Sequence, residues 1–146
     1  MVFSKSFGYS ISALLYIALT SKKKEKVQLK EIAAELGIPK PFLGKLMNKI
    51  AKEGVLNSIK GPKGGFSINQ RTLKTPLIKL VEITGEIESS ETCVLRLRKC
   101  NSKNPCPLHH QIDTIRKNYN ELLSSTTIGD LIHKDQPNFI RSIASI

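Results

Sequence analysis

Two short helical patterns, separated by a break of only a few residues, constrain the fold of this chain most. Residues 29–36 and residues 43–50 each repeat apolar side chains at the helical period. Between them, Gly37 supplies a helix stop, and Pro39 and Pro41 pre-set the first turn of the next helix. This spacing predicts a helix-turn-helix, in which the second helix lies in the major groove of DNA.

A glycine- and proline-rich turn follows this helix pair. Two short apolar runs, residues 55–59 and 66–68, flank the sequence Gly61-Pro62-Lys63-Gly64-Gly65, which predicts a β-hairpin. One interpretation is an ordinary surface hairpin. Its position directly after a helix-turn-helix, together with Lys60 and Lys63, favours a wing that contacts DNA.

The remaining patterns are helical or irregular. Apolar stripes predict a helix over residues 7–18 and a short helix over 77–87, and a long helix of about five turns is expected from Pro107. Residues 88–106 show no period and predict a loop, and a tail is expected from about Pro137. The expected fold is mainly α with a small β-hairpin. A winged helix-turn-helix domain spans residues 1–76, and a linker helix, a cysteine loop and a dimerisation helix span residues 77–146.

Charge is concentrated in the first half of the chain. Lysine and arginine number 23 against 12 acidic residues, a net charge of +11, and residues 1–76 hold 14 of the basic and only 4 of the acidic side chains. A soluble protein with lysine-rich loops would show a similar composition. Because the excess coincides with the helix-turn-helix, a nucleic acid is the favoured partner.

The predicted recognition helix carries polar side chains away from its apolar stripe. A lysine-rich helix face is often only solvated, yet lysines here can bind phosphates and an asparagine can pair with adenine. The donors are Lys40, Lys45, Asn48, Lys49 and Lys52.

The three cysteines of the chain lie within fourteen positions of the polar loop. Cys93, Cys100, Cys106 and His109 supply enough ligands for zinc or an iron–sulfur cluster. Gaps of six and five residues are unlike the close cysteine pairs of structural zinc sites, so a cluster fits better. The alternative is three unrelated thiols. If Pro107 begins the long helix, Cys106 lies at its N-terminus, where the thiolate is favoured. His110 lies about 100° further around that helix, so only one histidine is expected to face the site.

The sequence does not favour a membrane protein or an enzyme. No apolar run is long enough to span a bilayer, and a cytoplasmic location is expected. The chain has no phosphate-binding glycine loop and no visible catalytic constellation, so it is not expected to be an enzyme.

Together these features resemble the Rrf-type winged-helix transcription regulators. The resemblance covers nearly the whole chain, and its most specific parts are the wing sequence from Lys60 to Phe66 and the three-cysteine loop. Further matches are Ser4-Lys5, Ile32-Ala33, Gly37-Ile38-Pro39 and Phe42-Leu43.

The resemblance implies a homodimer joined through the long helix, which binds a partly palindromic operator in double-stranded DNA. The resemblance adds Ser4, Lys5 and Gly64 to the residues that are expected to contact DNA. It also implies a cluster, 2Fe–2S rather than 4Fe–4S, on the three cysteines with His109 as fourth ligand. In a nitric-oxide-sensing branch an aspartate serves as that ligand, and Gly8 stands in its place here.

Two alternatives keep the DNA binding without a cluster. The cysteines could form a reversible thiol switch. A regulatory protein partner, such as a metabolic enzyme, could instead control a repressor whose cysteines are incidental.

Overall fold

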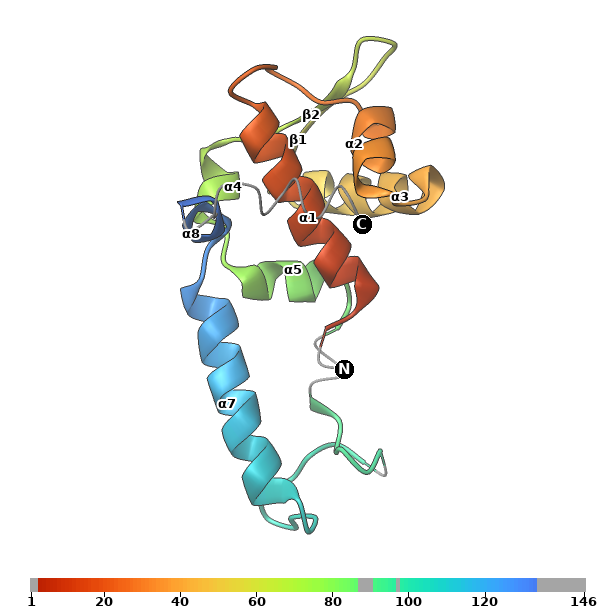
Figure 1. Cartoon of the computed structure of the whole chain (residues 1–146). Coiled ribbons are helices and arrows are strands. Elements are labelled where there is room, and N and C mark those ends of the chain that lie inside the picture. The colour runs from red at the N-terminus through yellow and green to blue at the C-terminus, as the bar shows by residue number, and fades with distance from the viewer. Residues whose placement is uncertain (1–2, 87–90, 97, 134–146) are drawn as a thin grey trace.

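The computed structural model describes residues 3–86, 91–96 and 98–133. Helices dominate it, and one antiparallel hairpin lies after the third helix (Figure 1). This confirms the expected mainly α fold. In chain order the elements are α1 (Lys5–Thr20), α2 (Leu29–Leu36), α3 (Lys40–Lys52), β1 (Asn57–Ile59), β2 (Gly65–Ser67), α4 (Gln70–Lys74), α5 (Leu77–Ile83), α7 (His109–Ser125) and α8 (Ile128–His133).

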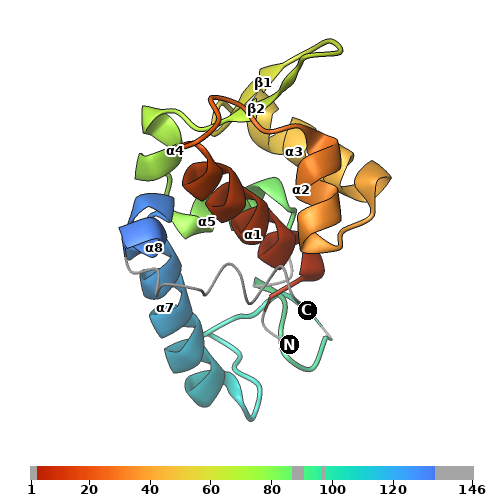
Figure 2. The ribbon, with the colours of Figure 1, turned by 45° about the horizontal axis from the view of Figure 1, so that its top comes forward.

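The core forms around α1, which has α2 and α3 on one side, and α5 passes behind α1 in the view of Figure 2. Leu14 and Ile17 of α1 are buried in one cluster with Ile32 of α2 and Leu43 of α3. The apolar stripes of three helices therefore meet in a single interior, as their spacing predicts.

The turn between α2 and α3 follows from Gly37. Its φ of 64° is in the left-handed region, where a residue without Cβ is favoured, and its amide donates to the carbonyl of Ala33. Ile38 then enters the core, and Pro39 precedes the first residue of α3. The turn thus places α3 across α2 with its polar side outward.

The hairpin pairs Asn57 with Ser67 and Ile59 with Gly65. Val27, just before α2, adds a bridge on the other side of β2, where it exchanges two backbone hydrogen bonds with Phe66. Phe66 is buried, so its ring holds the base of the hairpin against the core.

One short helix differs from the expectations, and two expected features extend beyond the described residues. Helix α4 was not predicted; it exists because Asn69 and Thr72 form a capping box at its start. Helix α5 ends at Ile83, and Ile87 lies outside the described residues. The tail expected from Pro137 also lies outside them.

The long helix begins at His109, not at Pro107. The amide of His109 donates to the carbonyl of Cys106 across 2.9 Å, so Pro107 and Leu108 form a turn before the helix. The prediction that Cys106 directly precedes the first helical residue is therefore wrong.

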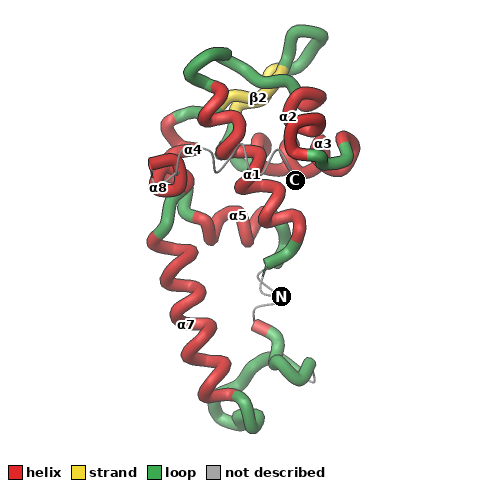
Figure 3. The backbone as a smooth tube through the Cα atoms, viewed as in Figure 1, coloured by secondary structure: helices red, strands yellow, loops and turns green. Residues whose placement is uncertain are grey.

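The chain returns to the core after α7. Figure 3 shows α7 running away from the cysteine loop toward α8, which lies beside α4. The amide of Leu77 donates to Thr126 and that of Ile128 to Thr75, and both Leu123 and Ile128 are buried. Residues from both sides of position 76 therefore share one core. No described helix has the length and apolar character needed to cross a membrane.

Candidate functional site: a basic helix and wing, and a cysteine hollow

Helix α3 presents a polar face to solvent because its four apolar residues are all turned inward. Leu43, Leu46, Met47 and Ile50 are buried. The five predicted DNA-contacting side chains of this helix are exposed, and its four lysines form no ion pair with any described residue. They are Lys40, Lys45, Asn48, Lys49 and Lys52.

A groove of about 790 Å³ separates α3 from β1. Asn48 and Lys52 line it from the helix, and Asn57 and Lys60 line it from the hairpin. The structure therefore brings residues of the predicted recognition helix and of the predicted wing to one groove. Such a groove with cationic walls suits a phosphate backbone.

The tip of the wing exposes Lys60 and Lys63, as expected, but buries Gly64. The amide of Gly64 donates to Gly61 across 2.9 Å. A Cβ on Gly64 would lie 2.1 Å from the carbonyl oxygen of Ile59, closer than any side chain allows. Gly64 thus shapes the turn that carries the two lysines.

Ser4 and Lys5 lie at the start of α1, and both are exposed. The hydroxyl of Ser4 caps the helix by accepting from the amide of Phe7 at 3.1 Å, and it also donates to the carboxylate of Glu86. Ser4 therefore has structural partners in the free protein, whereas the ammonium group of Lys5 forms no ion pair with a described residue.

Phe42 was not among the candidate site residues, although it lies on the same helix. Its side chain is 43% exposed, and its ring meets Tyr9 of α1 edge-on at 5.8 Å. An aromatic residue held at the surface of a recognition helix can contact thymine methyl groups or sugars. In the sequence, Phe42 is an aromatic residue that does not belong to the apolar stripe of α3, and this signal could have identified it as a surface residue.

Residues 91–93 and 98–100, within the expected cysteine loop, pair as a short hairpin. Thr92 pairs with Lys99, the amide of Cys93 donates to Arg98, and that of Cys100 donates to Glu91, each across 2.9 Å. Because residues 91, 93, 98 and 100 then share one face of the hairpin, Cys93 and Cys100 lie on the same side.

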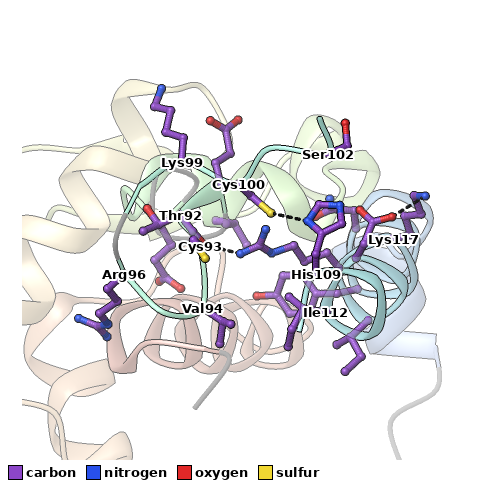
Figure 4. Close-up of a pocket in the computed structure, with 18 of the residues that line it drawn as sticks. Thr92, Cys93, Val94, Arg96, Lys99, Cys100, Ser102, His109, Ile112 and Lys117 are labelled. Carbon is purple, nitrogen blue, oxygen red and sulfur yellow. Dashed lines mark hydrogen bonds and ion pairs between the residues drawn. The ribbon is translucent and has the colours of Figure 1, made fainter. Parts of the chain in front are cut away.

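That hairpin and helices α5 and α7 line an open hollow of about 1310 Å³ (Figure 4). Cys93, Cys100 and His109 line it, and the Sγ of Cys100 lies 3.3 Å from the Nδ1 of His109. Cys93 is 5% exposed and His109 is 8% exposed, which is low for a histidine at the first position of a helix.

The other two candidate groups lie outside the lining of this hollow. Cys106 is half-buried in the turn before α7. His110 is exposed and meets His109 edge-on, with ring centres 5.4 Å apart. Only one histidine faces the hollow, as the helical spacing predicts. Among the described residues no three ligand side chains are close enough to hold a single metal ion.

Polar contacts fix the walls of the hollow. The guanidinium of Arg116 donates to the carbonyl of Thr92 and so ties the hairpin to α7. Lys117 donates to Asp113 at 2.7 Å, which lowers the pKa of that exposed carboxyl. Burial raises the pKa of Tyr119, and the negative charge of Glu86 raises it further.

Known proteins are similar to this chain over most of its length. Residues 3–134 match the family model Rrf2, described as iron-dependent transcriptional regulator. A protein of Aquifex aeolicus (strain VF5), named as an HTH-type transcriptional regulator, is 37% identical over 138 residues, 93% of this chain and 94% of its own length. The regulator IscR of Vibrio vulnificus (strain YJ016) is 24% identical over 128 residues, 88% of this chain and 75% of its own.

Two solved structures are similar in fold. CymR, the global cysteine regulator of B. subtilis, gives a TM-score of 0.71 at 20% identity, and the match covers 92% of this chain and 98% of that one. IscR of T. potens gives a TM-score of 0.69 at 19% identity, covering 94% and 90%. These relatives are transcriptional regulators and not enzymes.

Proposed function

The chain belongs to the Rrf2 family of transcriptional regulators, and on that premise we propose that it binds a partly palindromic operator as a homodimer and senses through an iron–sulfur cluster. In this proposal α3 enters the major groove and Lys60 and Lys63 of the wing contact the neighbouring backbone. Cys93, Cys100, Cys106 and His109 would hold the cluster, with 2Fe–2S favoured over 4Fe–4S.

The observation that carries the sensing proposal is the pair formed by Cys100 and His109. A thiol and an imidazole nitrogen 3.3 Å apart, both facing a hollow that a second cysteine lines, form a donor set that iron accepts. His109 is only 8% exposed and its Nδ1 faces the Sγ of Cys100, and ligation of iron would explain why an imidazole is buried at this place.

The donor set fits a cluster more readily than a single ion. A cluster has two or more irons, so its ligands stand further apart than the ligands of one metal ion. When bound, such a group supplies a centre whose charge and stability change with oxidants or with iron supply. The side chain of Cys106 must move toward the hollow, because in the structure it lies outside the lining.

The homodimer is supported by the exposed face of α7. Ile115 and Leu122 of α7 are 58% and 56% exposed and stand seven residues apart, and Leu108, just before the helix, is 44% exposed. Exposed apolar residues at this spacing form a stripe that can serve as the seam between two helices. If the α7 helices of two protomers packed together, they would bury apolar side chains that are exposed to solvent in a single protomer.

The test is a visible absorption and circular dichroism spectrum, with iron and sulfide assays, on protein purified without oxygen. We expect a coloured protein whose spectrum changes in the His109→Ala variant and stays the same in His110→Ala. A colourless protein that cannot be reconstituted would exclude the cluster and leave DNA binding intact. An equal response of the two variants would exclude His109 as ligand.

A thiol switch without a cluster is the second candidate. Cys93 and Cys100 lie on one face of the hairpin, and a structural relative, S. aureus CymR, has been solved in an oxidized form, with a TM-score of 0.68 to this chain. Mass spectrometry of iron-free protein, with and without peroxide, separates the two candidates. A reversible disulfide that changes DNA affinity would favour the switch.

A further inference from the structure

We propose that the lysine-rich segment that follows α1 and reaches the first turn of α2, residues 22–30, is a second phosphate-binding surface. It contacts phosphates of the DNA duplex that lie beyond the phosphates contacted by the wing. This inference rests on the proposed DNA binding and deepens it. It assigns DNA contact to Lys22, Lys23 and Lys26, none of which belongs to the recognition helix or the wing.

The charge of this segment is concentrated and largely uncompensated. Residues 22–30 contain five lysines and one acidic residue, Glu25. Lys24 forms an ion pair with Glu31 at 3.0 Å. Lys22 and Lys23 are exposed and Lys26 is half-exposed, and none of the three forms an ion pair with a described residue.

The backbone holds these charges in place. The amides of Lys23 and Lys24 both donate to the carbonyl of Thr20, and the hydroxyl of Ser21 donates to Ala18 at 2.6 Å. The turn is therefore tied to the end of α1, and binding a phosphate there would not require the backbone to become ordered.

Hydrogen bonds also attach the segment to the wing. Val27 donates to Phe66 at 2.9 Å and accepts from it at 2.8 Å, so residue 27 forms an isolated bridge on the free side of β2. The side-chain amide of Gln28 lies 3.5 Å from the carbonyl oxygen of Pro62 in the wing turn. Figure 1 shows the segment and the wing at the same end of the molecule.

The strand order gives the direction of the extra contact. The groove lined by Asn48 and Lys60 lies between α3 and β1, and β2 separates β1 from Val27. The lysine segment is thus at the edge of the hairpin opposite to the β1 edge that borders this groove. A duplex that lies along α3 and the wing reaches this segment only if it extends further, and lysines, as point charges, then bind its phosphates without reading sequence.

The experiment measures affinity for a 40-base-pair duplex as a function of salt. The probe is one DNA duplex of a single arbitrary sequence, and the proteins are the full chain, the double variant Lys22→Gln/Lys23→Gln and the double variant Lys74→Gln/Lys103→Gln. The control pair removes the same charge from two exposed lysines outside the lysine-rich segment, the recognition helix and the wing. A plot of log affinity against log salt concentration has a negative slope, and each lost phosphate contact reduces the magnitude of that slope by about 0.9.

We expect the slope of Lys22→Gln/Lys23→Gln to be smaller by about 1.8 per bound protomer, and that of the control pair to stay close to the slope of the parent. Equal slopes for the two variants would overturn this inference while leaving the proposed DNA binding in place. A parent protein without salt-dependent DNA binding would overturn both. Circular dichroism of the variants excludes misfolding as the cause.

Discussion

The hydroxyl and the backbone amide of Ser4 both donate to the carboxylate of Glu86, the amide across 3.2 Å. Ser4 begins the first helix of the DNA-binding part, and Glu86 lines the cysteine hollow. The contact therefore joins the start of α1 to a wall of the candidate sensing site, although 82 positions separate the two residues.

Replacement of Ser4 by alanine removes the helix cap and the hydrogen bond from the hydroxyl to Glu86, and it leaves the hydrogen bond from the backbone amide. We expect Ser4→Ala to lower the free energy of unfolding by about 1 kcal/mol, the usual cost of losing a serine cap. Urea denaturation followed by circular dichroism measures it, with Ser12→Ala, a serine in the middle of α1, as the control. A Ser4 variant as stable as the Ser12 variant would contradict the capping role.

Asn48 and Lys49 are adjacent on the exposed face of α3 and are expected to act differently. Asn48→Ala should cost about 1–3 kcal/mol of discrimination at one base pair, because an amide can pair with a base edge. Lys49→Ala should weaken binding to all sequences alike and lower the salt slope by about 0.9. Selection of bound sequences from a randomised pool, repeated at two salt concentrations, separates the two effects. Identical changes in both variants would contradict this assignment.

Gly64 is expected to be intolerant of any side chain. Its Cβ would lie 2.1 Å from Ile59 and 2.9 Å from Gly61, both backbone oxygens, so the wing turn must shift in Gly64→Ala. We expect weaker DNA binding at unchanged helix content and a loss of stability of about 1–3 kcal/mol. Gly8→Ala is the matched control, since no atom lies within 4 Å of its Cβ and alanine favours the helix. Full DNA affinity of Gly64→Ala would refute the role of this turn.

The exposed seam of α7 predicts a dimer that one charge can weaken. Ile115→Glu places a carboxylate in the centre of the seam, and we expect the dimer dissociation constant to rise at least about tenfold, which corresponds to about 1.4 kcal/mol. Thr114→Glu adds the same charge at the neighbouring position off the seam and should leave the dimer intact. Sedimentation velocity over a concentration series measures both. A parent protein that is monomeric at all concentrations would remove the basis of this prediction.

Apolar periodicity in the sequence was sufficient to locate most of the architecture. The helices around Leu14, Ile32 and Leu43, the turn at Gly37 and the hairpin around Gly61–Gly65 all lie where their local patterns predict. These features depend on residues close together in the chain, so a short window contains the information. Helix α4 escaped notice because it has a single turn, and its capping box uses asparagine and threonine in place of the more familiar serine and glutamate.

The spacing of the cysteines by itself indicated which residues could form a sensing site. The lysines and the asparagine in the α3 sequence indicated which residues could contact DNA. Only the tertiary structure decided that Cys100 and His109 face each other, that Cys106 lies outside the hollow, and that Ser4 reaches Glu86. It also decided that Val27, which follows the lysine-rich segment, pairs with Phe66 of β2. These relationships depend on how helices and strands pack across long separations in sequence, and no local pattern encodes such packing.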